Sequence, residues 1–174
     1  MGSQGLFPTD MATPKQLMSL TGKSLLGARC SAPLTPYECI YMLPLTTIKM
    51  DKGTAIVTSV PSDSPDDYAA FMDLKQPKKR EFYGVEASWV EPFDLVEVME
   101  CELEYKSDKL TVPPTKTRRA AEFMYDALKI QSQKDVEKLH EAHDVVYNAG
   151  FYKGTMIAGE FKGLSVQVIA PDCC

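Results

Sequence analysis

The sequence lacks the features of a membrane-spanning or exported protein. No apolar run approaches the ~20 residues that a membrane-spanning helix needs, and the amino terminus has no basic-then-apolar signal peptide. The five cysteines are odd in number and form no CxxC pair, which argues for free thiols in a reducing compartment rather than a disulfide framework. With 44% hydrophobic and 25% charged residues, the chain has an ordinary globular composition. We therefore predict a soluble, cytoplasmic protein with no membrane partner.

An excess of positive charge is also absent. The net charge of −5 gives no global attraction to polyanions, so contact with nucleic acid would have to be local or part of a larger, more basic body. Two basic clusters are candidates, KQPKKR at residues 75–80 and KTRR at residues 116–119. Solvated surface is the simpler interpretation of each cluster.

Short motifs for phosphate or metal binding are incomplete. Gly22-Lys-Ser would need a second glycine five residues earlier to form a phosphate loop, and Leu17 stands there. His140 and His143 are the only histidines, and the acids interleaved with them indicate a solvated or half-buried helix face rather than a metal site. No cysteine stands in a recognisable nucleophile elbow. We predict no metal site.

The distribution of apolar residues predicts an α+β fold. A strand over 37–48, interrupted or at an edge at Pro44, is followed by a turn at 51–53 and a strand over 54–60, which together predict a hairpin. Further strands are predicted over 93–103, 155–158 and 164–169. Residues 105–117 are polar and contain two consecutive prolines, so we predict an exposed loop there.

Three helices are predicted, over residues 65–75, 118–128 and 132–150. The last begins at Ser132 with Asp135 at its third position, and it ends near a glycine at residue 150. One face of that helix carries Val136, Leu139, His143 and Val146. By these patterns the chain divides into an irregular lead-in (1–20), a main domain (21–169) and a frayed end (170–174).

The most informative segment joins the uncharged strand 54–60 to the helix that starts at Pro65. Ser64 is a suitable cap for this helix, and proline suits the first helical position. Three acids follow the strand: Asp63, Asp66 and Asp67. A buried strand that delivers fixed carboxylates to its carboxyl-terminal edge suits a pocket for a cationic group. Helix capping alone also explains Asp66 and Asp67, and a binding role requires one of them to point away from the backbone.

Several separate blocks of this sequence resemble the editing domain of cytosolic, eukaryotic and archaeal-type leucyl-tRNA synthetases. The blocks are SAPLT (31–35), IYMLP (40–44), TI (47–48), DKGT (51–54), IVTSVPSDSPDD (56–67), LKIQSQ (128–133), GFYKGTM (150–156) and GEFKG (159–163). They occur in the family's order and span roughly residues 17–167. A match in several blocks is more specific than any single short motif.

The resemblance implies a β-barrel-like editing domain with flanking helices, of which this chain supplies part. The full enzyme joins leucine to its tRNA in a separate Rossmann-type core, which uses ATP and magnesium. Its editing domain hydrolyses tRNA that carries a wrong amino acid, such as norvaline, isoleucine or methionine, with water as nucleophile and with no metal or cofactor. The partners implied are the acceptor end of tRNA(Leu) and the remainder of the synthetase.

The same resemblance assigns roles to individual residues. Asp67 matches the aspartate that anchors the α-ammonium of the misattached amino acid and is the candidate catalytic residue. Thr58, on the matching strand, and Thr54 are candidate substrate-binding residues. The candidate wall for the terminal adenosine of the tRNA consists of Thr46, Thr47, Ile48 and Lys52.

Two departures from the family pattern bear on activity. The family's threonine-rich segment, whose hydroxyls bind the amino acid and position water, has no counterpart in these 174 residues. Residues 104–120 look expanded, and Ala55 stands where the family has a second glycine. We therefore expect roughly the last two-thirds of an editing domain, weak or inactive by itself. The alternatives are a non-catalytic module that binds a tRNA end or a protein, and a truncated product without independent function.

Overall fold

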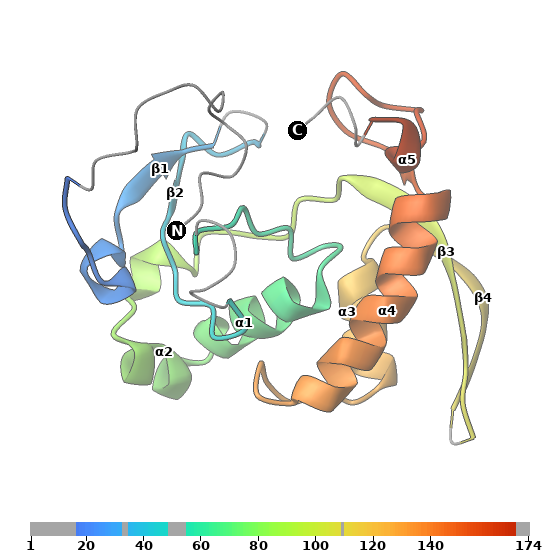
Figure 1. The fold of residues 1–174 in the computed structure, drawn as a ribbon, viewed down its shortest axis with the longest axis horizontal. Helices are drawn as coiled ribbons and strands as arrows, with labels where there is room; N and C mark the ends of the chain where they lie inside the picture. The colour runs from blue at the N-terminus through green and yellow to red at the C-terminus, as the bar shows by residue number, and fades with distance from the viewer. Residues whose placement is uncertain (1–16, 33–34, 49–54, 109, 170–174) are drawn as a thin grey trace.

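The computed structural model describes residues 17–32, 35–48, 55–108 and 110–169 (Figure 1). Its helices are η1 Gly22–Leu25, α1 Pro65–Lys75, α2 Pro77–Tyr83, η2 Ala87–Trp89, α3 Ala120–Ala127, α4 Val136–Lys153 and α5 Val166–Ile169. Its strands are β1 Arg29–Ser31, β2 Cys39–Tyr41, β3 Met99–Lys106, β4 Thr111–Thr117 and β5 Thr155–Met156. The predicted α+β class is confirmed.

The strands form two small antiparallel sheets. In the larger one, β3 lies between β4 and β5, and Cys101 faces Thr117 across the β3–β4 ladder. In the smaller one, β1 pairs with β2, and Cys30 faces Ile40. Apart from a single bridge between Thr155 and Ser165, strand pairing in the described ranges is confined to these sheets.

The main core lies between β3 and three helices. Residues on β3 alternate, so Cys101 and Leu103 face inward while Glu102 faces solvent. Helix α4 runs beside the β3–β4 pair in Figure 1 and contributes one buried stripe. The buried cluster consists of Ala69 from α1, Cys101 and Leu103 from β3, Ala120 and Met124 from α3, Ile130, and Leu139, Ala142, Val146 and Ala149 from α4. None of the helices in the described ranges is both long and apolar enough to cross a membrane.

The helix predicted over 65–75 is confirmed at both ends. The N–H of Asp67 donates to Ser64 Oγ at 3.4 Å, which satisfies one of the free amides of the first turn. The helix ends at Lys75, as predicted from Pro77. Pro77 then occupies the first position of a second helix, α2, which was not predicted.

The predicted hairpin between residues 37–48 and 54–60 is wrong. Strand β2 is short and pairs with β1, and residues 55–60 belong to no strand. Two local features oppose a ladder here: Ala55 has a φ of 59°, and the Val60 amide donates to the Asp67 side chain. The predicted turn at 51–53 and Thr54 lie outside the described residues.

The loop predicted over 105–117 is also wrong, because residues 111–117 form β4. This strand lies at the edge of its sheet, where proline is tolerated because one side of the strand makes no ladder bonds. The pairing register shifts between Leu103 and Tyr105, opposite the prolines at 113 and 114, so an irregularity in the ladder accommodates them.

Two further boundaries differ from prediction. Helix α4 begins at Val136 rather than Ser132, and Val136 is 66% exposed, so the predicted apolar face is rotated. The helix passes through Gly150, where a Cβ would lie 2.3 Å from Met99 Cε, so this glycine permits close packing on β3 instead of ending the helix.

The strand predicted over 164–169 is wrong, because a short helix, α5, follows the bridge at Ser165.

Candidate functional site

Asp67 lies in the first turn of α1, and its side chain holds the segment that precedes this helix. Its Oδ2 accepts the N–H of Val60 at 2.8 Å. Burial raises the pKa of the Asp67 carboxyl, and the hydrogen bond from Val60 opposes this shift. The side chain therefore points back toward residues 55–60 and is held there. The bond fixes the carboxylate, and it also stabilises the loop that leads into α1.

The candidate substrate residue Thr58 lies on the segment that Asp67 holds. Thr58 is exposed and stands two residues before Val60, the hydrogen-bond partner of Asp67. The structure thus brings Thr58 and Asp67 to one local region through the Val60 amide. Thr54 and Lys52 lie outside the described residues.

The candidate adenosine wall is anchored to a different part of the fold. Both the N–H and the Oγ1 of Thr46 donate to Gln133 Oε1, at 3.1 and 2.7 Å. Gln133 is 1% exposed, and its own N–H donates to Asp73 Oδ2 at 3.1 Å. Thr47 and Ile48, which follow Thr46, are half-buried.

Helix α1 carries both anchors. Asp67 is in its first turn, and Asp73, six residues later, receives the Gln133 amide that supports Thr46. Six residues of α-helix correspond to a rise of about 9 Å. The proposed ammonium anchor and the support for the adenosine wall are therefore fixed on one rigid element.

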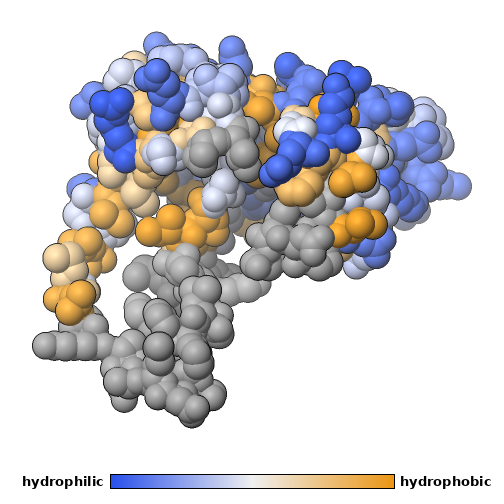
Figure 2. All heavy atoms as spheres, turned by 90° about the horizontal axis from the view of Figure 1, so that it is seen from above, coloured by the Kyte–Doolittle hydropathy of each residue, from blue (hydrophilic) through white to orange (hydrophobic). Residues whose placement is uncertain are grey.

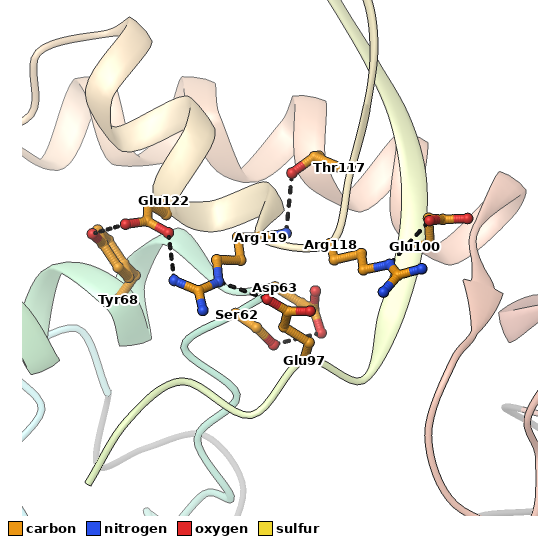
Figure 3. A network of polar contacts seen from close by, with 9 residues as sticks. All are labelled: Ser62, Asp63, Tyr68, Glu97, Glu100, Thr117, Arg118, Arg119 and Glu122. Atoms are coloured by element: carbon orange, nitrogen blue, oxygen red, sulfur yellow. Dashed lines mark hydrogen bonds and ion pairs between the residues drawn. The ribbon is translucent and has the colours of Figure 1, made fainter.

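Sequence analysis missed an ion-pair network beside this helix, drawn in Figure 3. Arg119 donates from Nε to Glu97 Oε1 at 2.7 Å and from Nη1 to Glu122 Oε2 at 3.4 Å. Glu122 also accepts the hydroxyl of Tyr68 at 3.3 Å. Arg119 and Glu122 are three positions apart at the start of α3, but Glu97 and Tyr68 come from other parts of the chain, so no local pattern signals the whole network.

Asp63 lies next to this network and is the most perturbed acid described. Its Oδ2 accepts the hydroxyl of Ser62 at 3.0 Å, while its buried Oδ1 has no partner among the described residues. Burial raises the pKa of Asp63 to about 7, and the charge of Glu97 adds to the shift. An acid in this state changes charge near neutral pH.

The basic cluster at 116–119 is neutralised by acids. Lys116 and Arg118 both pair with Glu100, at 2.5 and 3.1 Å, and Arg119 pairs with Glu97 and Glu122. These side chains line an open hollow of about 570 Å³ that contains none of the predicted site residues. Because acids and bases line it together, the hollow offers no excess positive charge to a ligand.

The motifs set aside in the sequence have ordinary structural roles. Residues Gly22–Leu25 form a short 3₁₀ helix, η1. His140 and His143 lie exposed on α4, with ring nitrogens 3.4 and 3.6 Å from Asp144 carboxylate oxygens. No group of three or more metal-ligating side chains gathers within the described part of the chain.

Comparison with known proteins gives a consistent result. The chain is 46% identical over 168 residues to the cytoplasmic leucine–tRNA ligase of Pongo abelii, which covers 96% of this chain and 13% of that protein. It is similar to the solved structure of GlLeuRS-CP1, with a TM-score of 0.70, 37% identity and coverage of 88% of this chain and 51% of the other. It is also similar to the editing domain of the P. knowlesi cytosolic leucyl-tRNA synthetase, with a TM-score of 0.70, 28% identity and coverage of 94% and 52%. No protein-family model matches the chain.

The fold is that of part of an aminoacyl-tRNA synthetase editing domain. The relationship is specifically to the editing domain of cytosolic leucyl-tRNA synthetases, as the sequence blocks indicated. The chain spans 13% of the Pongo abelii enzyme and about half of each solved editing domain. The relatives named above are called cytoplasmic or cytosolic, in agreement with the predicted location.

Proposed function

We propose that this chain contributes to a hydrolytic editing site, within a leucine–tRNA ligase, that removes a wrong amino acid from tRNA(Leu). The carboxylate of Asp67, held by Val60 at the start of α1, is the observation that carries this proposal. The amino acid of an aminoacyl ester has a free α-ammonium, whereas a residue inside a peptide chain does not. A fixed carboxylate is a natural partner for that group through charge-assisted hydrogen bonds.

The proposed roles follow from this placement. Asp67 binds the ammonium, and Thr58 and Thr54 contribute contacts to the same amino acid. The terminal adenosine of the tRNA lies against a wall of Thr46, Thr47, Ile48 and Lys52. Because α1 supports both Asp67 and Thr46, the two ends of the aminoacyl-adenosine are held in a fixed relation.

The reaction is hydrolysis of an ester. Water adds to the carbonyl carbon, the bond from that carbon to the ribose oxygen breaks, and the proton lost by water is taken up by the ribose oxygen. The products are the free amino acid and uncharged tRNA. In this proposal the editing site uses no metal or cofactor, and ATP and magnesium serve the synthetic core of the whole enzyme.

An editing step has a physical reason. A synthetic site built for leucine discriminates against a substrate that differs by one methylene by only about 1–3 kcal/mol. Hydrolysis at a second site adds a further stage of selection after the ester has formed. Because the threonine-rich segment is not among these 174 residues, we expect the chain to need that segment in trans to position water.

The test is deacylation of isoleucyl-tRNA(Leu) by the chain mixed with a threonine-rich amino-terminal fragment. Asp67→Asn keeps an oxygen that can accept the Val60 amide but removes the charge, so we expect the rate to fall about 10- to 100-fold, as for a charge-assisted hydrogen bond of ~1.5–3 kcal/mol. The matched control is Asp66→Asn, which removes the same charge from the same helical turn and should change the rate less than about twofold. Equal effects of the two variants, or no effect of Asp67→Asn, would contradict the assignment.

A further inference from the structure

We propose that a hollow between α2 and the turn at 132–134 binds a single-stranded nucleic-acid end, with Lys78 and Lys134 on its phosphates and Phe82 stacked on a base. The inference rests on the proposed function and deepens it, because it places the strand that leads to the terminal adenosine. The hollow has a volume of about 230 Å³. It is lined by Asp73, Lys78, Lys79, Phe82, Tyr83, Ser132 and Lys134.

The charge of this hollow favours an anion. Lys79 is paired with the buried Asp73 at 2.5 Å, so that pair is neutral. Lys78 and Lys134 are exposed, and neither forms an ion pair with any residue in the described ranges. Two cations therefore remain uncompensated at the hollow, in contrast to the neutralised cluster at 116–119.

An exposed aromatic ring lies beside these cations. Phe82 is 77% exposed, although burying a phenylalanine is normally favourable. Lys134 Nζ lies 5.9 Å from the centre of its ring, and the ring of Tyr83 meets it edge to face at 5.1 Å. An accessible ring next to lysines is the combination by which proteins bind single strands, since bases stack on the ring while the cations follow the backbone.

The hollow is linked to the candidate adenosine wall through the buried side chain of Gln133. Gln133, in the turn that forms one side of the hollow, accepts two hydrogen bonds from Thr46 and donates to the Tyr83 hydroxyl at 3.4 Å. Lys79 joins the same two elements through a hydrogen bond to the carbonyl of Gln131 at 3.3 Å. Helix α2 and the segment leading into α4 both lie along the lower edge of Figure 1. In this proposal, a strand whose last nucleotide rests on Thr46 passes over this hollow.

The test is fluorescence anisotropy of the full chain with a labelled single-stranded RNA of about eight nucleotides, within the site sizes of such proteins. The double variant Lys78→Ala/Lys134→Ala should weaken binding about five- to tenfold. It should also lower the slope of log affinity against log salt by about 1.4, at ~0.7 for each phosphate contact on a single strand. The matched control, Lys153→Ala/Lys162→Ala, removes the same charge from exposed lysines elsewhere and should change affinity less than about twofold.

Phe82→Leu distinguishes a nucleic acid from other polyanions. It should weaken RNA binding about fivefold or more with the salt slope unchanged, because stacking is lost and the charges remain. Circular dichroism melting checks that these exposed positions leave folding intact. The inference is overturned if the two lysine doubles behave alike, or if Phe82→Leu has no effect and polyglutamate competes as well as RNA, which would indicate an acidic protein partner. If these RNA-binding tests fail while deacylation still depends on Asp67, the proposed RNA-binding surface is disproved and the proposed editing site is unaffected.

Discussion

At the scale of single residues, the two neighbouring acids Asp63 and Asp67 differ in what surrounds them. Burial raises the pKa of Asp67, and a backbone hydrogen bond from Val60, which favours the charged form, opposes this shift. Asp63 has only the Ser62 hydroxyl, a buried oxygen without a partner among the described residues, and the charge of Glu97 nearby. Both carboxyls therefore carry an electrostatic cost in their charged form, and a backbone N–H offsets part of that cost at Asp67.

At Asp63, that cost predicts how stability depends on pH. The pKa of Asp63 is raised from 3.8 to about 7, so the folded state holds the proton more tightly than the unfolded state does. Its stabilising contribution is fully present below pH ~4 and is lost as pH rises through about 7, by at most about 4 kcal/mol at ~1.4 kcal/mol for each pKa unit. Asp63→Asn should remove this dependence and be more stable than the original chain at pH 8 in urea unfolding.

An exposed acid provides the comparison for that experiment. Asp108→Asn removes one carboxylate from the loop between β3 and β4 and should leave the pH profile of stability parallel to that of the original chain. Parallel profiles for Asp63→Asn as well would show that the buried carboxyl does not titrate in the folded state as described.

At the scale of secondary-structure elements, α1 positions the site, and its amino-terminal cap is the feature most open to a local test. Ser64→Ala removes the oxygen that accepts the Asp67 N–H and should cost about 1 kcal/mol of unfolding free energy, measured in urea. Ser88→Ala, at an exposed serine in η2, should cost less than about 0.5 kcal/mol. Equal losses for the two variants would show that the cap does not stabilise α1.

The secondary-structure elements differ in how well the sequence alone predicts them. The start and end of α1 were predictable because serine capping and proline at the first helical position act within a few residues. Strand β4 was not, because Pro113 and Pro114 oppose a strand locally while pairing with β3 stabilises one. The prediction for residues 55–60 was wrong in the opposite direction. A β-branched run predicted a strand, but the N–H of Val60, at its end, donates to Asp67 instead of to a neighbouring strand.

Among the candidate site residues, how much could be predicted depends on how far apart the interacting residues are in the sequence. Asp67 could be proposed from sequence because it lies in a block that resembles the editing-domain family, and its structural partner Val60 is only seven residues away. The Thr46–Gln133 contact joins positions 87 apart, and the Asp63–Glu97–Arg119 neighbourhood likewise depends on the tertiary fold. Burial and long-range hydrogen bonds of this kind leave no periodic signal in the chain.

At the scale of the whole molecule, the distribution of exposed apolar residues agrees with a partial domain. Figure 2 shows apolar side chains gathered on one face, while the end that carries β3, β4 and α4 in Figure 1 is hydrophilic. Leu17, Met18 and Val57 are 87%, 70% and 53% exposed. Because the matched solved domains are about twice the length of the matched part, we expect further chain to cover these residues in a complete editing domain.

The central claim is that this chain holds the ammonium-binding part of an editing site that water-positioning residues complete. The most direct test measures the rate at which isoleucyl-tRNA(Leu) is deacylated by the chain alone and by the chain with the threonine-rich fragment. The account predicts a rate near the uncatalysed one for the chain alone and a clear acceleration with the fragment. Full activity from the chain alone, or no activity from the mixture of two folded partners that bind each other, would contradict it.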